Sequence, residues 1–317
     1  MTLRVLAPAK INLGLEVIGR RPDGYHEIAT VMVAVSLFDR LTLSLTPELT
    51  LAVDSSRGLA KRSSLEEIGA ERNLAMKAAM QLQERAQVAQ GAEIRLTKRI
   101  PMAAGLGGAS SDAAAVLVAL RALWGTDLSE GEIEALAAAL GSDVPFFLSG
   151  GTALARGRGE VLTRLPRARL GWFVIAVPNR TIERKTARLY GMLGPEDYTS
   201  GEDASRVATL IANGKAPPPA LLRNAFERPI LELMPEVTAL REAFLAAGAP
   251  FVALSGAGPA LYTRVDRLAE AVAITWNLRQ RLGDSGTVHL CRPVDLSPLI
   301  ASDGDSGLAQ RSGPFAR

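Results

Sequence analysis

The residues best suited to chemistry lie in one glycine-rich stretch, from Lys98 to Asp112, which reads KRIPMAAGLGGASSD. Polar and apolar residues alternate before it, as in a half-buried strand, and the apolar run from Ala113 to Trp124 indicates a helix after it. Amides at the start of a helix lack intrahelical partners and, with the helix dipole, attract anions. Ser110 or Ser111 can cap this helix. The stretch therefore predicts a phosphate site.

Two common kinds of phosphate loop do not match this stretch. A Walker A loop requires Lys and then Ser or Thr after its last glycine, whereas Gly108 is followed by Ala109. A dinucleotide fingerprint requires a βαβ unit, whereas the next segment is a second helix that begins with the capping box Ser129 and Glu132. A simple tight turn is disfavoured because three glycines and two serines lie together at a helix start.

Two further side chains are candidates for acid, base or charge chemistry. Lys10 and Asn12 lie in a segment that alternates like a strand, so we expect them on one face together with Gly14 and Glu16. A strand lysine usually faces solvent, but lysine is rare among the 36 basic residues of this chain. Asp143 precedes a short apolar segment, where capping alone is enough to explain an aspartate.

Composition restricts the fold and the kinds of cofactor. A chain of 317 residues with 48% hydrophobic residues predicts two domains with substantial cores. We find no apolar run long enough to span a membrane and no signal peptide, so we expect a cytoplasmic protein. One cysteine and two histidines cannot build a disulfide framework or a Cys/His zinc site. Any metal is therefore expected to take oxygen ligands, as Mg²⁺ does.

The charge of the chain favours a small anionic substrate over nucleic acid. The net charge is +3, the basic residues are scattered, and aromatic residues make up 5% of the chain. Stacking platforms for bases are therefore scarce, and mild basicity suits anionic small molecules.

Several ordered motifs resemble one superfamily of kinases. Residues 101–115 resemble the P-x-x-x-G-L-G-[GS]-[GAS]-S-[SA] motif of the galactokinase, homoserine kinase, mevalonate kinase and phosphomevalonate kinase superfamily. Within it, the opening PAKINL at residues 8–13, RPDGYH at 21–26, GSDVPFF at 141–147 and SGAGP at 255–259 are similar to the 4-diphosphocytidyl-2-C-methyl-D-erythritol kinase family. Two segments depart from that pattern: 178–186 carries extra residues including Arg184 and Lys185, and Asn224-Ala225-Phe226-Glu227 lacks an aspartate.

The resemblance implies an α+β fold of two domains with the active site in the cleft between them. We expect a ribosomal-protein-S5-like ATP-binding domain at residues 1–160, a ferredoxin-like domain at 161–295 and a disordered tail at 296–317. The expected ferredoxin-like elements are strand Trp172 to Val177, helix Val237 to Ala247, hairpin Val252 to Val265, helix Leu268 to Leu282 and strand Val288 to Cys291.

The resemblance also implies a reaction and roles for residues. The reaction is ATP- and Mg²⁺-dependent phosphorylation of the 2-hydroxyl of 4-diphosphocytidyl-2-C-methyl-D-erythritol, in non-mevalonate isoprenoid synthesis. Asp143 is expected as the base beside Lys10, and Ser111 as a Mg²⁺ ligand. Asn12, Tyr25, His26, Thr186 and Tyr190 are expected to bind the acceptor, with Tyr25 stacking on cytosine and His26 bonding its edge. ATP is expected at Pro101, Met102, Ala103, Ala104, Gly105, Leu106, Gly107, Gly108, Ala109, Ser110 and Ser111, with Asn73 and Lys98 near adenine.

Two other functions remain open on the sequence alone. One is a kinase of the same superfamily that acts on another alcohol, such as homoserine or mevalonate. The other is a non-catalytic protein of this fold that binds a nucleotide or RNA. We expect a small-molecule partner, no nucleic acid, no membrane, and a monomer or homodimer.

Overall fold

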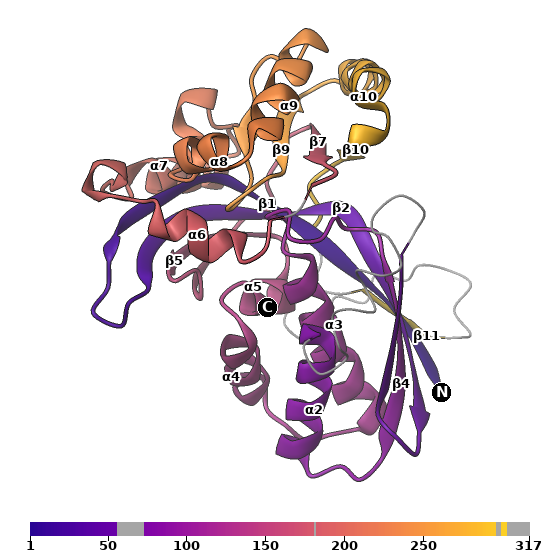
Figure 1. Cartoon of the computed structure of the whole chain (residues 1–317). Helices are drawn as coiled ribbons and strands as arrows, with labels where there is room; N and C mark the ends of the chain where they lie inside the picture. Colours follow the sequence, from indigo (N-terminus) through magenta and orange to yellow (C-terminus); the bar gives the residue numbers. More distant parts are fainter. Residues whose placement is uncertain (56–72, 181, 296–298, 303–317) are drawn as a thin grey trace.

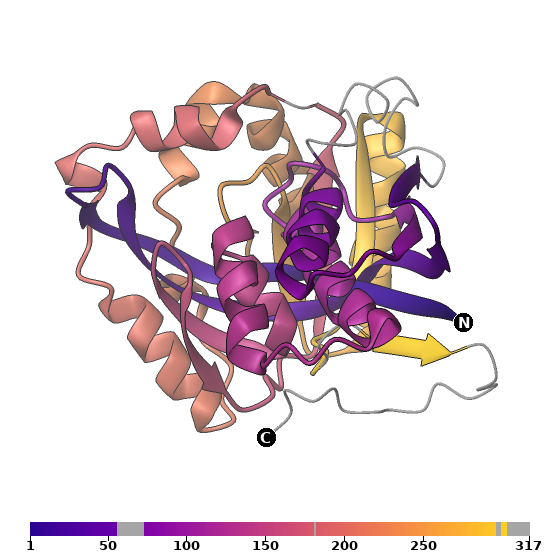
Figure 2. The ribbon, with the colours of Figure 1, turned by 90° about the horizontal axis from the view of Figure 1, so that it is seen from below.

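Two long antiparallel strands, β1 (Thr2–Arg20) and β2 (His26–Thr46), run through the middle of the molecule (Figure 1). The computed structural model describes residues 1–55, 73–180, 182–295 and 299–302. Figure 2 shows the tip of the β1–β2 hairpin and the N-terminus at opposite sides of the molecule. The central parts of both strands are buried, because helices cover one face and the second half of the chain covers the other.

The first sheet has seven strands in the described part of the chain. Its order is β11-β1-β2-β4-β3, with β5 paired to β2 and β6 paired to β5. The shorter strands are β3 (Thr50–Ser55), β4 (Gly91–Lys98), β5 (Thr152–Gly157), β6 (Val161–Leu165) and β11 (Leu299–Ser302). Helices α2 (Leu74–Ala86), α3 (Gly108–Trp124), α4 (Glu130–Leu140) and α5 (Val144–Ser149) cover one face (Figure 1). The capping box of Ser129 and Glu132 starts α4, as predicted.

The second sheet is antiparallel and has the order β10-β7-β9-β8. Its strands are β7 (Trp172–Pro178), β8 (Ala253–Leu254), β9 (Leu261–Val265) and β10 (Gly286–Cys291). Helices α9 (Pro235–Ala246) and α10 (Leu268–Leu282) pack on one face, and α6 (Lys185–Gly191), α7 (Glu202–Ala212) and α8 (Glu227–Leu233) lie in the connection between β7 and β8. The order of strands and helices confirms the ferredoxin-like plan and the α+β class.

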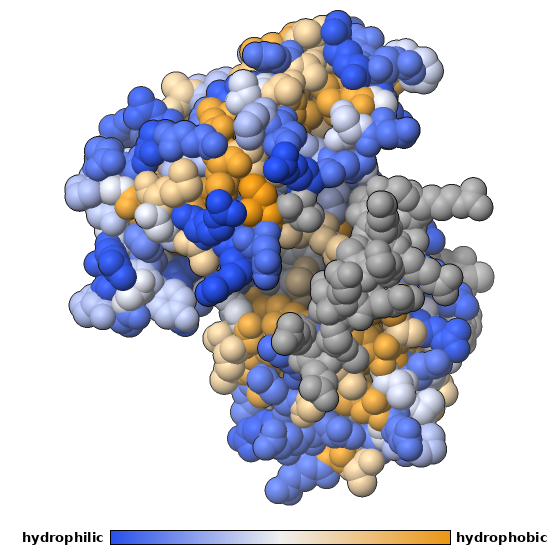
Figure 3. Space-filling model, in the orientation of Figure 1, coloured by the Kyte–Doolittle hydropathy of each residue, from blue (hydrophilic) through white to orange (hydrophobic). Residues whose placement is uncertain are grey.

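A shared core joins the two domains. Ile11 and Val33 of the first sheet pack with Phe173 and Tyr262 of the second. The Tyr262 hydroxyl donates a hydrogen bond of 3.0 Å to the carbonyl oxygen of Asn12. The strands that carry the predicted site are therefore held between two layers. The face of the molecule seen in Figure 3 is mainly hydrophilic, with apolar patches on both domains.

Strands β6 and β11 both belong to the first sheet, although they lie beyond the predicted end of the first domain. Strand β6 extends the first sheet to Leu165, beyond the boundary that we placed after residue 160. Residues 299–302, which we predicted to be disordered, form β11 and pair with Leu3 to Leu6. This pairing supplies hydrogen-bond partners to the outer edge of β1. The rest of the predicted tail lies outside the described residues.

The alternation from Val31 to Leu45 predicts strands with a turn at Asp39-Arg40. The predicted turn is wrong, because Asp39 lies inside β2. The strand runs without a break from His26 to Thr46, and a register shift relative to β1 falls just before Phe38. Ser36 and Leu37 therefore have no partner in the pairing of β2 with β1. Asp39 is fully buried. Across the described residues, none of the helices is long and apolar enough to cross a membrane.

Candidate active site

A cleft of about 810 Å³ is lined by some of the predicted site residues, from both domains. The glycine loop contributes Gly105, Gly107 and Ser110 to its wall, and Lys10 and Asp143 lie beside them. The cleft also reaches an aromatic cluster, formed by Tyr25, His26, Tyr190, Tyr198 and Phe226. Its charged lining residues are Lys10, Arg20, Arg158 and Lys185 against Asp143. This excess of positive charge favours polyphosphate ligands.

The loop adopts the predicted strand, loop and helix arrangement, but a glycine starts the helix. Helix α3 begins at Gly108, and its N-cap Gly107 has φ of 72°, a conformation that side chains disfavour. A Cβ atom on Gly107 would lie 2.7 Å from Phe147 Cζ and 3.0 Å from Lys10 Cγ. The Lys10 amide donates to the Leu106 carbonyl oxygen at 2.9 Å. Close packing therefore requires glycine here and fixes the loop against the strand that carries Lys10.

The two loop serines have different positions, and neither caps the helix. Ser110 lines the cleft, whereas Ser111 is fully buried. The Ser111 Oγ has no hydrogen-bond partner among the described residues. Ser110 is therefore the loop serine that lines the cleft, and the role of Ser111 as the metal ligand stays a prediction.

Lys10 and Asp143 meet at the centre of the cleft. Their Nζ and Oδ2 atoms are 3.4 Å apart; the lysine side chain is 5% exposed and the carboxylate 34%. Asp143 is the N-cap residue of α5, yet its side chain makes no capping hydrogen bond. Lys10 Nζ also donates to Asn12 Oδ1 at 2.5 Å, and Asn12 Nδ2 donates to Thr30 Oγ1 at 3.0 Å. Capping therefore does not explain Asp143, whose carboxylate is free to face a substrate.

A bulge at Gly14 changes the face that we predicted for β1. Gly14 has φ of 75°, and the pairing with β2 shifts between Leu13 and Leu15. After the bulge, Leu15 joins Lys10 in lining the cleft. Glu16 instead accepts hydrogen bonds from the amides of Gly201, at 3.2 Å, and Ala204, at 2.7 Å. The expected grouping of Glu16 with Lys10 and Asn12 is therefore wrong, because the extra residue reverses the alternation.

The turn at residues 255–259 closes one side of the loop. A Cβ atom on Gly105 would lie 2.2 Å from the Ser255 carbonyl oxygen, so the two backbones are in direct contact. Asn224 holds the turn by donating to the carbonyl oxygens of Leu254 and Gly256 at 3.1 and 2.9 Å. Segment 224–227, whose contribution the sequence left open, thus supports the turn.

The aromatic cluster forms the far end of the cleft. The rings of His26 and Tyr190 stack with centroids 4.8 Å apart at 23°. Phe226 meets Tyr190 edge to face, also at 4.8 Å. Burial, and then the charge of Arg20, lower the pKa of His26, so its imidazole is neutral at pH 7. Burial and the charge of Asp143 raise the pKa of Tyr190 to about 12. A neutral imidazole among aromatic rings suits a nucleobase.

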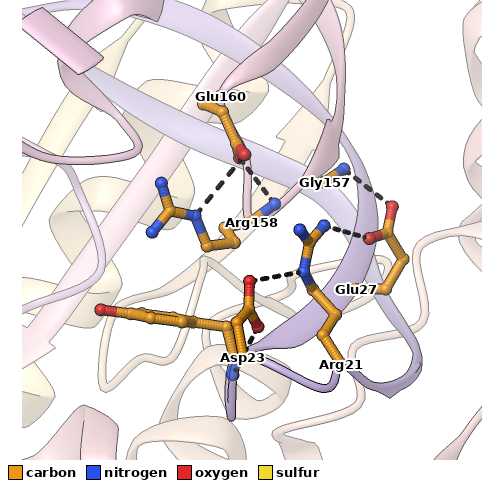
Figure 4. Close-up of polar contacts among 7 residues, drawn as sticks. Arg21, Asp23, Glu27, Gly157, Arg158 and Glu160 are labelled. Atoms are coloured by element: carbon orange, nitrogen blue, oxygen red, sulfur yellow. Dashed lines mark hydrogen bonds and ion pairs between the residues drawn. The ribbon is translucent and has the colours of Figure 1, made fainter. Parts of the chain in front are cut away.

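Arg21 holds the hairpin tip that carries Tyr25 through two ion pairs, and the neighbouring Arg158 pairs with Glu160 (Figure 4). Arg21 pairs with Asp23 at 3.1 Å and with Glu27 at 2.8 Å. Glu27 also accepts from the Gly157 amide at 3.0 Å. The Arg158 guanidinium lies 4.8 Å from the centroid of the Tyr25 ring, which is 56% exposed. This tip therefore presents a large aromatic surface to the cleft in a fixed place.

Asn73 and Lys98 do not line the cleft. Asn73 caps α2 by accepting a hydrogen bond from the Ala75 amide at 2.9 Å. Lys98 is buried and pairs with Asp39 and Asp112. Both residues have structural roles, and their placement near adenine stays a prediction.

Asp39, Lys98 and Asp112 form a buried triad beneath the loop, which we did not predict. Asp39 Oδ1 accepts from the amides of Arg99 and Ile100 at 2.5 and 2.8 Å, and its Oδ2 pairs with Lys98. Lys98 Nζ lies 2.6 Å from Asp112 Oδ2. Burial acts to lower the pKa of Lys98, but the two carboxylates outweigh it and raise that pKa. The triad thus fixes the point where β4 becomes the loop.

Comparisons with known proteins identify the family. Two family models, described as "GHMP kinases N terminal domain" and "GHMP kinases C terminal", match residues 73–151 and 207–282. A 4-diphosphocytidyl-2-C-methyl-D-erythritol kinase from Dehalococcoides mccartyi is 41% identical over 294 residues, covering 92% of this chain and all of the relative. The chain belongs to the 4-diphosphocytidyl-2-C-methyl-D-erythritol kinase family. It is therefore an ATP-dependent small-molecule kinase.

Other relatives of this kinase family agree. The relative from Symbiobacterium thermophilum is 46% identical over 255 residues, covering 80% of this chain and 87% of the relative. A crystal structure of a 4-(cytidine 5′-diphospho)-2C-methyl-D-erythritol kinase is 35% identical and superimposes with a TM-score of 0.73, covering 92% of this chain and 100% of the other. A homoserine kinase from Cytophaga hutchinsonii shares the fold. It is 20% identical and superimposes with a TM-score of 0.70, covering 95% of this chain and 97% of that chain.

Proposed function

We propose that this kinase transfers the γ-phosphoryl group of ATP to the 2-hydroxyl of 4-diphosphocytidyl-2-C-methyl-D-erythritol, giving the 2-phosphate and ADP. The observation that supports this most is the layout of the cleft. The glycine loop, the Lys10–Asp143 pair and the aromatic cluster line one continuous cavity. This arrangement suits a donor triphosphate, a reacting alcohol and a nucleobase, respectively.

In this mechanism the loop amides and the N-terminus of α3 hold the phosphates of ATP. Asp143 accepts the proton of the acceptor hydroxyl and orients its oxygen toward the γ-phosphorus. The Lys10 ammonium lies 3.4 Å from this carboxylate and stabilises charge on the transferred oxygens. Phosphoryl transfer usually has a loose transition state, so orientation by Asp143 contributes more than its basicity.

The cleft fits a magnesium ion that is held mainly by the nucleotide. Among the described residues there is no group of three His, Cys, Asp or Glu side chains that could hold a metal. Mg²⁺ commonly retains waters and binds substrate phosphates with one or two protein oxygens. The Ser110 hydroxyl would supply such an oxygen, and the ion would neutralise charge on the β- and γ-phosphates.

An assay of ADP release with a panel of alcohols tests the proposal. We expect the chain with ATP and Mg²⁺ to phosphorylate 4-diphosphocytidyl-2-C-methyl-D-erythritol with a far higher kcat/KM than homoserine or mevalonate. Phosphorus NMR of the product would place the new phosphate on the 2-oxygen. A higher kcat/KM for another alcohol, or thermal stabilisation by nucleotides without ADP release, would contradict it.

Changing the aromatic cluster should affect the acceptor alone. We expect Tyr25→Ala or His26→Ala to raise KM for the cytidine acceptor roughly 10- to 100-fold, because stacking on a base contributes about 1–3 kcal/mol. KM for ATP should change less than twofold. Trp276, which is 63% exposed on α10, offers a matched aromatic control as Trp276→Ala. Equal losses for both substrates would exclude a role in base recognition.

A further inference from the structure

Lys185 is a buried basic residue of the cleft to which the reaction above gives no role. It is the first residue of α6 and is 5% exposed. Its ammonium donates to the carbonyl oxygens of Ala257, at 2.9 Å, and Gly258 in the turn beside the glycine loop. A lysine ammonium has three donors, so these two bonds leave one for a ligand.

The charge of Lys185 has no carboxylate partner. Within the described residues, no carboxylate lies within ion-pair distance of its Nζ, and Asp143 already pairs with Lys10. Burial, and then the charge of Lys10, lower the pKa of Lys185 to about 7. A buried ammonium near another ammonium is unfavourable unless an anion joins it. The surroundings therefore suit a ligand that brings negative charge.

The position of Lys185 relates it to the acceptor. Thr186 and Tyr190 follow on the same helix and also line the cleft, and Tyr190 stacks on His26. The turn that Lys185 contacts lies against Gly105, on the side of the reacting groups. In an acceptor that joins a cytosine to an alcohol through a diphosphate, the diphosphate occupies the span between these two places.

We propose that Lys185 is a specificity residue of this kinase, whose ammonium binds the diphosphate of the acceptor. The proposal rests on the proposed function and extends it. It gives a physical reason for discrimination against alcohols such as homoserine, which carry no diphosphate and would leave this ammonium unpaired in a buried site. Arg184 and Lys185, which appeared in the sequence only as extra residues, thus include one that recognises substrate.

Binding of cytidine 5′-diphosphate and of cytidine, measured by calorimetry, tests this role. We expect Lys185→Met to weaken the binding of cytidine 5′-diphosphate about 10- to 100-fold, because charge-assisted hydrogen bonds are lost. The binding of cytidine should weaken less than twofold. Binding of a non-hydrolysable ATP analogue with Mg²⁺ should be unchanged. Arg188→Met removes a charge from the exposed side of the same helix and should change none of the three affinities.

Proton uptake provides a second readout. At pH 8 the Lys185 amine is mostly neutral, and binding of an anion raises its pKa. Cytidine 5′-diphosphate is titrated into each protein by calorimetry in Tris and in HEPES, and the difference in binding heat between the two buffers reports the protons taken up. We therefore expect proton uptake by the wild type and less by Lys185→Met. The other charged and titratable residues that line this cleft are retained in both proteins: Lys10, Arg20, Tyr25, His26, Asp143, Arg158, Tyr190 and Tyr198.

Each other outcome overturns the role of Lys185. Weaker binding of the ATP analogue alone would assign Lys185 to the donor phosphates. If Lys185→Met loses affinity for cytidine and for cytidine 5′-diphosphate to the same extent and has a lower Tm, Lys185 merely supports the turn. If the wild type prefers cytidine 5′-diphosphate to cytidine and Lys185→Met keeps that preference, this proposal alone fails. If the wild type binds neither, the proposed function fails with it.

Discussion

Replacing Asp143 with asparagine is expected to lower kcat by ~10²–10⁴ and to change KM for either substrate only modestly. The carboxylate is one-third exposed in the cleft and lies 3.4 Å from the Lys10 ammonium. Asparagine keeps the size of the side chain but replaces the carboxylate with a neutral amide, which orients the acceptor hydroxyl less well and cannot accept its proton. Because Asp143 makes no capping hydrogen bond, its replacement should leave α5 intact. Steady-state ADP release measures the loss, and circular dichroism checks the fold.

The pairing of Lys10 with Asp143 gives this prediction a further test. If both side chains act on the same reacting oxygen, Lys10→Met and the double variant should each lose about as much activity as Asp143→Asn. Additive losses in kcat would mean that the two residues act independently. Wild-type turnover by Asp143→Asn would remove it from the mechanism.

Asp39→Ala is expected to destabilise the fold by about 3–5 kcal/mol, since it removes one partner of a buried ion pair. The change leaves Lys98 with a single carboxylate and the amides of Arg99 and Ile100 without their acceptor. For a chain of 317 residues, the loss corresponds to a fall in Tm of roughly 4–8 °C. KM for ATP should rise as well, because the glycine loop begins directly after these amides. Thermal unfolding and initial rates measure the two effects.

A surface ion pair on the neighbouring strand is the matched control. Arg95 on β4 pairs with Glu93 at 3.0 Å, and its side chain is 68% exposed. Arg95→Ala should lower the free energy of unfolding by less than about 1 kcal/mol, because an exposed ion pair usually contributes no more than that. The loss of stability in Asp39→Asn should lie between the losses in Asp39→Ala and Arg95→Ala, because asparagine retains an oxygen for the two amides but loses the charge. If Asp39→Ala unfolds at the same temperature as Arg95→Ala, the triad is not what holds the loop.

Features that depend on neighbouring residues could be predicted from the sequence. The alternation before Lys98, the glycines and the apolar run after them predict strand, loop and helix, and the structure has β4, the loop and α3. The predicted helix from Leu268 to Leu282 matches α10. These predictions succeed because the alternation of polar and apolar residues, and the conformational freedom of glycine, determine the local structure of the segment in which they occur. The motifs around Lys10, Tyr25 and Asp143 also led to the kinase family that the comparisons identify.

Tertiary structure decided what depends on contacts between distant segments. The sequence around Asp39 predicts a turn, but the structure buries Asp39 beneath the loop, where its carboxylate accepts from the amides of Arg99 and Ile100 and pairs with Lys98. Ser110 rather than Ser111 faces the cleft because α3 starts at Gly108. Lys185 is a cleft residue only because the turn at 257–258 lies against α6. Residue type alone does not specify burial or the partner of a charge, because both arise when the two sheets close around the β1–β2 ribbon.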